Sequence, residues 1–151
     1  MTEFRFHHLE RRRVDQALPE LLERALEAGK RVVVQAGSEE EVEALNERLW
    51  TYSDDSFLPH GSKRDGSPET QPIYLTHDAD TPNAAEMRVV VGGDNPQPFF
   101  VGPHALVLIL FDGRDEDARA AARRQWSAAK AAGARLSYWR EGDDGGWVIG
   151  R

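Results

Sequence analysis

The chain has 151 residues, of which 40% are hydrophobic and 30% are charged, a balance that excludes a largely disordered chain and predicts one globular domain over residues 1–151. The formal net charge is −7, so the molecule as a whole repels nucleic-acid phosphates, and direct DNA contact would need a local basic patch. There is no cysteine, which excludes disulfides and thiolate metal sites, and because no apolar run approaches the roughly 20 residues of a membrane helix we expect a cytoplasmic protein.

The N-terminal part of the chain predicts a strand followed by a helix. Residues 3–9 alternate in character, with Phe4 and Phe6 on the same side of a short strand. Apolar residues then recur at helical spacing up to Gly29, a residue typical of a helix C-terminus. Pro19 favours a regular helix that begins near it, because proline lacks the amide hydrogen that a helix interior uses.

A second strand and a second helix follow directly. Residues 31–37 contain three consecutive valines, which is typical of a strand buried on both faces. The next segment opens with Ser38 as N-cap and Glu41 three residues later, a capping box that predicts the start of a helix running to about Trp50. The polar stretch 60–72 is rich in glycine, serine and proline, and it predicts a mobile loop.

The rest of the chain predicts more strands and one long helix. Three strands are predicted, at 73–77, 87–93 and 105–113. A proline-rich connection occupies 95–104. A helix is predicted over about 115–132, because acidic residues fill its first turn and Gly133 follows it. Residues 134–150 predict a strand pair around a Gly-Asp-Asp-Gly-Gly turn.

Strands that alternate with helices predict an α/β fold. We expect a single domain with a mostly parallel central sheet flanked by helices, Rossmann-like but without a phosphate-binding loop. The glycines at 92–98 lack the G-x-G-x-x-G spacing and are followed by proline rather than a helix. Asp112 ends the most apolar strand, where α/β enzymes place catalytic groups, but a simple Asp-Gly turn is the better explanation. The five histidines are scattered, so we predict no metal and no other cofactor.

One constellation in the last predicted helix points to binding rather than catalysis. Arg119, Arg123, Trp126 and Lys130 recur at helical spacing, so a single helix face carries three cations flanking a tryptophan. Arginines can grip a carboxylate bidentately while the indole contacts an aromatic side chain. The face is therefore suited to an acidic peptide with an aromatic or carboxylate end. A solvated basic face, with Trp126 tucked partly into the core, would give the same spacing.

The sequence also resembles a known family. The segments LW (49–50) and SFLPH (56–60) come after a helix that follows GKRVVVQA, and the late helix in RAAARRQWSAAKAAGARLSYW ends in an Ala-Gly turn before an aromatic strand. In order and spacing, over nearly the whole length, these features are similar to the chi subunit of bacterial DNA polymerase III. The resemblance implies a non-catalytic accessory protein that ties the clamp loader, through the psi subunit, to single-stranded-DNA-binding protein.

The resemblance also implies roles for particular residues. In the family, the acidic C-terminal tail of single-stranded-DNA-binding protein, which ends in Pro-Phe, docks beside basic and aromatic positions of the late helix. Those positions correspond to Arg119, Arg123 and Trp126, with Lys130 at the rim. The family resemblance therefore favours the docking interpretation of this helix face over a merely solvated one.

A second surface follows from the same resemblance. The psi-facing surface of the family includes the aromatic residues of the LW…SFLPH segment, which implies that Trp50 and Phe57 are partner anchors. The alternative is that Trp50 packs into the core while Pro59 and His60 stiffen the loop. The second partner is the psi subunit, an equivalent clamp-loader component or a helicase. We assign no role to Tyr52 or to the acidic hairpin at 141–146.

Two other classes of function compete with this interpretation. A nucleotide-binding α/β enzyme would need a phosphate-binding loop or a convergent acid-base set, and the sequence shows neither. A direct single-stranded-DNA-binding module would use the same Arg/Trp helix for stacking, against the acidic charge of the whole chain. We therefore expect no strong direct nucleic-acid binding, no membrane association, and a monomer in the absence of partners.

Overall fold

The structure, a computed structural model, describes residues 2–52, 58–78, 80–91, 105–144 and 146–150. The helices are α1 (Val14–Glu27), α2 (Glu39–Thr51) and α3 (Glu116–Ala131), with short 3-10 helices at Lys63–Asp65 and Pro68–Thr70. The strands are β1 (Glu3–Leu9), β2 (Val32–Gln35), β3 (His60–Ser62), β4 (Ile73–Thr76), β5 (Met87–Val90), β6 (Leu106–Asp112), β7 (Arg135–Glu141) and β8 (Trp147–Ile149). The predicted connection at 95–104 lies outside the described residues.

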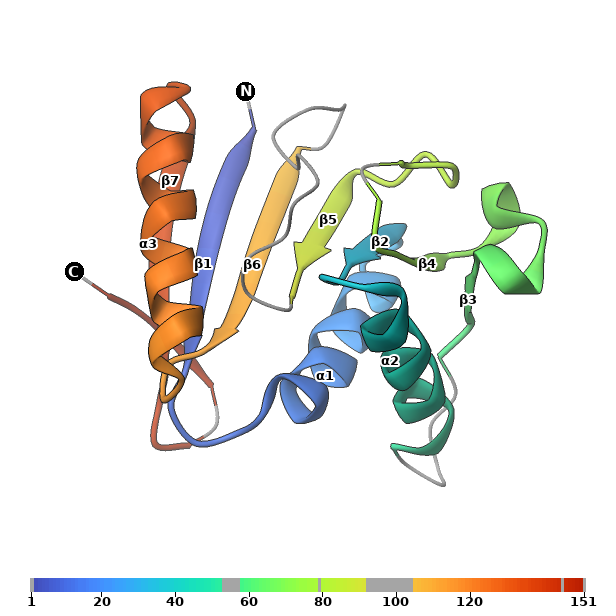
Figure 1. Ribbon diagram of the computed structural model, residues 1–151, viewed down its shortest axis with the longest axis horizontal. Coiled ribbons are helices and arrows are strands. Elements are labelled where there is room, and N and C mark those ends of the chain that lie inside the picture. The colour runs from blue at the N-terminus through green and yellow to red at the C-terminus, as the bar shows by residue number, and fades with distance from the viewer. Residues whose placement is uncertain (1, 53–57, 79, 92–104, 145, 151) are drawn as a thin grey trace.

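The eight strands form one sheet in the order β3-β4-β2-β5-β6-β1-β7-β8 (Figure 1). Every neighbouring pair is parallel except β7 and β8, which are antiparallel. The predicted α/β fold with a mostly parallel sheet is therefore confirmed. Among the described helices, none is long and apolar enough to cross a membrane.

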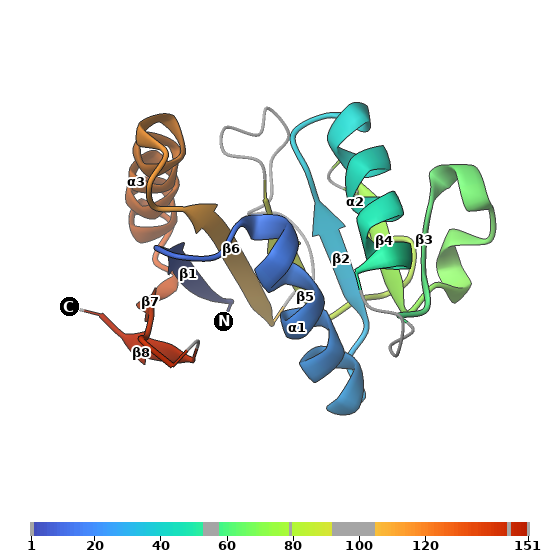
Figure 2. The same ribbon diagram turned by 90° about the horizontal axis from the view of Figure 1, so that it is seen from below.

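Alternation along the strands divides the core between the two faces of the sheet. On one face, α1 and α2 cover a cluster that includes Leu22, Val34 and Leu110. On the other face, α3 covers a cluster that includes Phe6 and Ile109. The view from below shows α3 and β8 at one end of the sheet and β3 at the other (Figure 2). The molecule therefore has two distant ends, each with its own helix.

The prediction that the first helix begins near Pro19 is wrong. Helix α1 begins at Val14, and Pro19 is a buried residue inside it. Proline removes one backbone hydrogen bond, which leaves the carbonyl of Asp15, four residues earlier, without its helical donor. The Nε of Arg48 in α2 donates a hydrogen bond to that oxygen at 3.4 Å. Tertiary packing thus compensates for a residue that disfavours the helix locally.

The prediction of a mobile loop at 60–72 is also wrong. Residues His60–Ser62 form β3, which pairs with β4, and two 3-10 helices follow it. The capping box at Lys63–Asp65 uses the carboxylate of Asp65, which accepts a hydrogen bond from the backbone N–H of Ser62 at 2.7 Å. A strand of three residues with no apolar alternation gives no periodic signal in the sequence.

The C-terminal hairpin is fastened to the turn after β1 by one buried carboxylate, that of Glu141. Its Oε1 accepts hydrogen bonds from the backbone N–H groups of Glu10 (3.0 Å), Arg11 (2.7 Å) and Arg12 (3.2 Å). Its Oε2 accepts a hydrogen bond from the Nε of Arg12 at 2.6 Å. Although burial would raise the pKa of this carboxyl, the hydrogen bonds outweigh that effect and hold the pKa at about 2. This contact fixes where β7 lies relative to β1.

Candidate functional site

The inner face of helix α3 is made mostly of small residues. Ala121, Ala122 and Ala129 are buried against the strands. The helix begins where the carboxylate of Asp115 accepts hydrogen bonds from two backbone N–H groups of the first turn. It ends before Gly133, which has a positive φ of 79°. These local signals match the predicted span of the helix.

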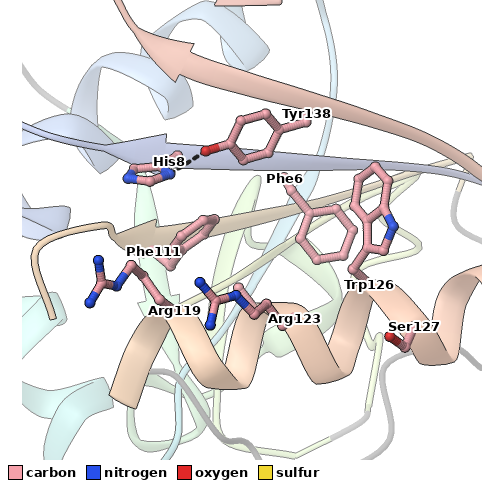
Figure 3. Close-up of a pocket in the computed structure, with 9 residues that line it drawn as sticks. Phe6, His8, Phe111, Arg119, Arg123, Trp126, Ser127 and Tyr138 are labelled. Carbon is pink, nitrogen blue, oxygen red and sulfur yellow. Dashed lines mark hydrogen bonds between the residues drawn. The ribbon is translucent and has the colours of Figure 1, made fainter. Parts of the chain in front are cut away.

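A cavity of about 420 Å³ opens between α3 and the strands β1, β6 and β7 (Figure 3). Aromatic side chains of the strands and the helix supply its apolar wall, and two arginines of the helix supply its positive charge. The cavity is lined by Phe6, His8, Phe111, Arg119, Ala122, Arg123, Trp126, Ser127 and Tyr138. A cavity with an apolar body and a few converging polar groups is typical of a ligand site.

The structure brings three of the four α3 residues singled out in the sequence to this cavity. Arg119, Arg123 and Trp126 line it, whereas Lys130 is exposed in the last turn of the helix and is not part of the lining. Trp126 is half-buried, and its ring packs edge-on against Phe6 with the centroids 5.1 Å apart. The indole therefore belongs both to the small core under α3 and to the cavity wall.

The two arginines of the cavity lie in different environments. Arg123 is exposed at the mouth, whereas Arg119 is half-buried. The Nε of Arg119 is buried and has no hydrogen-bond partner among the described residues. A guanidinium presents several donors in a planar fork, so a carboxylate that enters the cavity finds charge-assisted partners in these two arginines. The arrangement favours an anionic ligand that also carries an apolar group.

Six of the nine residues that line the cavity were not singled out as site residues in the sequence, and His8 and Tyr138 are the polar pair among them. The Tyr138 hydroxyl and the Nδ1 of His8 form a hydrogen bond across β1 and β7. Burial lowers the pKa of His8 and raises the pKa of Tyr138. The signal for His8 was present, because the alternation that places Phe4 and Phe6 on one side of β1 also places His8 there. Tyr138 could not be placed without knowing that β7 pairs with β1.

The backbone at the end of the C-terminal hairpin contacts Tyr138. Gly150 donates its backbone N–H to the carbonyl of Tyr138 at 2.6 Å. A Cβ added at Gly150 would collide with the Tyr138 ring, so only glycine permits this close approach. A second hollow beside the cavity shares Trp126 and Tyr138 with it and extends to Leu136 and Ile149. The groove therefore continues toward the hairpin.

The second predicted surface lies at the opposite end of the sheet. Trp50, in the last turn of α2, is 53% exposed, which disagrees with the alternative that it packs into the core. Its ring lies 4.5 Å from that of His60, which is buried in β3 rather than part of a loop. Phe57 lies outside the described residues. The Tyr52 hydroxyl donates a hydrogen bond to the carboxylate of Glu23, which joins the end of α2 to α1.

Within the part of the chain that the structure describes, no group of three or more histidine, aspartate or glutamate side chains could hold a metal ion. His7 is buried between Trp139 and Trp147, with ring centroids 5.9 and 4.5 Å away. Burial, together with the charge of Arg5, lowers the pKa of His7 to about 3. The ring therefore acts as a neutral packing element.

Comparison with known proteins shows to which family the chain is related. A model of the family described as "DNA polymerase III chi subunit, HolC" matches residues 1–137. A curated relative from Rickettsia prowazekii (strain Madrid E), named "Probable DNA polymerase III subunit chi", is 35% identical over 91 residues, which are 60% of this chain and 55% of the relative. The match therefore spans about half the length of that relative. Because the family model covers most of its length, the chain belongs to the DNA polymerase III chi subunit family.

Proposed function

We propose that this chain is a non-catalytic connector of the bacterial replisome. One end binds the acidic C-terminal tail of single-stranded-DNA-binding protein, and the other end joins the DNA polymerase III clamp loader through the psi subunit or an equivalent component. The observation that carries the first half is the cavity in which Arg119 and Arg123 stand beside Phe6, Phe111 and Trp126. In a tail that ends in Pro-Phe, the arginines suit the terminal carboxylate and the aromatic wall suits the phenylalanine ring.

In the proposed complex, the terminal phenylalanine ring enters the aromatic part of the cavity. The terminal carboxylate accepts hydrogen bonds from the guanidinium groups of the half-buried Arg119 and the exposed Arg123, which both line the cavity. The acidic residues that precede the dipeptide follow the exposed cations of α3, with Lys130 at the rim. We expect micromolar affinity, because a disordered peptide loses conformational entropy when it docks.

Trp126 provides the first test of this proposal. In calorimetric titration with a synthetic peptide of the acidic Pro-Phe tail, we expect saturable binding by the wild type. We expect affinity weakened on the order of tenfold or more in Trp126→Ala, because truncation of a buried aromatic anchor costs 2 kcal/mol or more. Trp126→Phe keeps an aromatic wall and retains most of the affinity. Absence of binding by folded wild-type protein would refute the tail-binding function.

The chemistry of the peptide end provides the matched control. A tail peptide that ends in a carboxamide loses the charge that the two arginines hold, and a peptide whose last residue is alanine loses the ring. We expect both to bind more weakly than the native tail. Equal binding of all three peptides would mean that the cavity does not hold the end of the tail, and that general charge attraction explains the binding.

His8 should make the binding of the tail depend on pH. Its pKa is lowered mainly by burial, opposed by Glu10 and aided by Arg140 and Arg119. A bound carboxylate favours the protonated ring, so the complex takes up a proton as pH falls. We expect the affinity to increase by about threefold between pH 7 and pH 5, and to be independent of pH in His8→Gln. The same calorimetric titration at several pH values measures this slope.

The second half of the proposal assigns Trp50 and Phe57 to the surface that faces the psi subunit or its equivalent. An exposed tryptophan beside a cavity is the kind of rigid anchor that dominates protein interfaces. Trp50 is held by its contact with His60, so its ring is positioned before any partner arrives. For Phe57, the proposal rests on the family resemblance of the SFLPH segment alone.

A further inference from the structure

Side chains of α2, β3 and the 3-10 helix after β3 form a second large cavity. These elements lie at the edge of the sheet far from α3 (Figure 1). The cavity has a volume of about 530 Å³, and its mouth includes the exposed ring of Trp50. Polar side chains of α2, β3 and the 3-10 helix that follows β3 make the rest of the wall. The cavity is lined by Glu43, Asn46, Glu47, Trp50, Ser62, Arg64 and Asp65.

This cavity is lined by more carboxylate groups than cationic groups. Three carboxylates face one guanidinium, that of Arg64, which forms an ion pair with Glu43 at 2.8 Å. Glu47 has no ion-pair partner in the described ranges. The Oδ1 of Asn46 is buried and has no hydrogen-bond partner among the residues that the structure describes. The Glu47 carboxylate is exposed and therefore suits a ligand that supplies hydrogen-bond donors and a positive charge.

Trp50 adds a flat aromatic wall to these acceptors. The residue is 53% exposed, and its ring packs at 4.5 Å, centroid to centroid, on that of His60. The imidazole of His60 is itself held in place, with Nδ1 at 2.6 Å from the carbonyl of Leu58 and Nε2 at 3.3 Å from that of Asn46. The indole is therefore fixed at the cavity mouth. Guanidinium groups stack on such rings and are more weakly hydrated than ammonium groups.

We infer that this cavity receives an arginine side chain from a basic segment of the second protein partner. The guanidinium stacks on Trp50 and donates hydrogen bonds to the carboxylate of Glu47. A planar cation with five donors matches this set of acceptors better than a lysine does, and an acidic or apolar side chain would leave the acceptors unsatisfied. The identity of the partner rests on the proposed function, whereas the arginine preference rests on the cavity alone.

The exposed surface of α2 has the charge that such a partner requires. Glu39, Glu40 and Glu41 form its first turn, and all three are exposed. A basic segment that places one arginine in the cavity therefore meets further carboxylates along the helix. Complementary charge of this kind speeds association and fixes register more than it adds affinity. The cavity supplies the specific contact, and the helix supplies the attraction.

A direct test uses the full chain and three blocked tripeptides, acetyl-Ala-Arg-Ala-amide and its lysine and citrulline counterparts. NMR titration at low salt follows the indole N–H resonance of Trp50, assigned from the Trp50→Phe variant. We expect a saturable shift with the arginine peptide. Affinity should be on the order of threefold weaker with lysine, and no saturation is expected with citrulline, which keeps the shape but loses the charge.

Two variants with the same loss of charge provide the control. Glu47→Gln removes a carboxylate that lines the cavity, and Glu40→Gln removes an exposed one from the same helix outside it. We expect Glu47→Gln to weaken the arginine peptide on the order of fivefold and Glu40→Gln to change its affinity by less than about twofold. No saturable shift, equal response to citrulline, or equal effects of the two variants would each overturn the arginine site.

The peptide titration and the Glu47→Gln variant also distinguish the arginine site from the proposed link to the psi subunit. Binding of the arginine peptide to the chain requires no psi subunit, so it can succeed when a purified psi subunit fails to bind. That result would support the arginine site and contradict the link through psi. If psi binds and Glu47→Gln leaves its affinity unchanged, the connector function stands and the arginine site is not part of that interface.

Discussion

Arg119→Ala should reduce the affinity for the acidic Pro-Phe tail on the order of tenfold or more, and Arg123→Ala should reduce it by less. The difference follows from their environments, because Arg119 is half-buried and its charge is less screened by water, whereas Arg123 is exposed. A hydrogen bond to a charged group contributes about 1.5–3 kcal/mol, which corresponds to tenfold or more in affinity. Calorimetric titration of the two variants with the same peptide measures both effects.

Arg124→Ala is the matched control for these variants. Arg124 is the next residue along α3, it is exposed, and it does not line the cavity. Its removal changes the net charge by the same amount, so it reports the general electrostatic contribution. That contribution should be small and should disappear at high salt, because exposed charges are screened. An Arg124→Ala effect as large as that of Arg119→Ala would show that the cavity does not select the tail.

Glu141→Gln should destabilise the fold by about 3 kcal/mol at neutral pH. The buried carboxylate accepts three backbone hydrogen bonds and one from Arg12, and a neutral amide cannot replace its charge. The same contact predicts how stability depends on pH. Its pKa is held at about 2, below the ordinary value of 4.5, so its stabilising effect is complete above pH 4.5 and is lost as the pH falls toward 2.

Chemical denaturation at several pH values tests this prediction. The free energy of unfolding of the wild type should fall by about 3 kcal/mol more than that of Glu141→Gln over the acid range. Asp143→Asn is the control, because Asp143 lies in the same hairpin and pairs with Arg11 but is almost fully exposed. An exposed ion pair contributes at most about 1 kcal/mol. Parallel acid profiles of the wild type and Glu141→Gln would contradict the assignment.

The parts of the fold that were predictable from sequence are those encoded by local chemistry. Ser38 accepts a hydrogen bond from the backbone N–H of Glu41 at 3.2 Å, as the capping box predicts. Helix α3 spans Glu116–Ala131, close to the predicted 115–132. The helix start near Pro19 was predicted wrongly because Arg48 of another helix offsets the local penalty of the proline. The strand at 60–62 was missed because its burial depends on pairing with β4.

The residues of the candidate site likewise fall into those that the sequence predicts and those that depend on tertiary contacts. Arg119, Arg123 and Trp126 share one helix, so their common face follows from the helical period alone. The other side of the cavity comes from three strands, and the partnership of His8 with Tyr138 depends on β1 lying beside β7. Sequence spacing predicts which residues share an element. It does not predict which elements meet.

The placement of β1 has a consequence for how the molecule folds. In chain order β1 precedes the other elements, yet its neighbours in the sheet are β6 and β7, so that Phe6 pairs with Ile109 on one side and with Tyr138 on the other. Contacts between distant parts of a chain form slowly, because loop closure costs entropy before the contacts stabilise it. The N-terminal strand must wait during synthesis for its partners. The cavity beside α3 is lined by residues of β1, β6 and β7, so a chain acquires it only after β1 has paired with both of these strands.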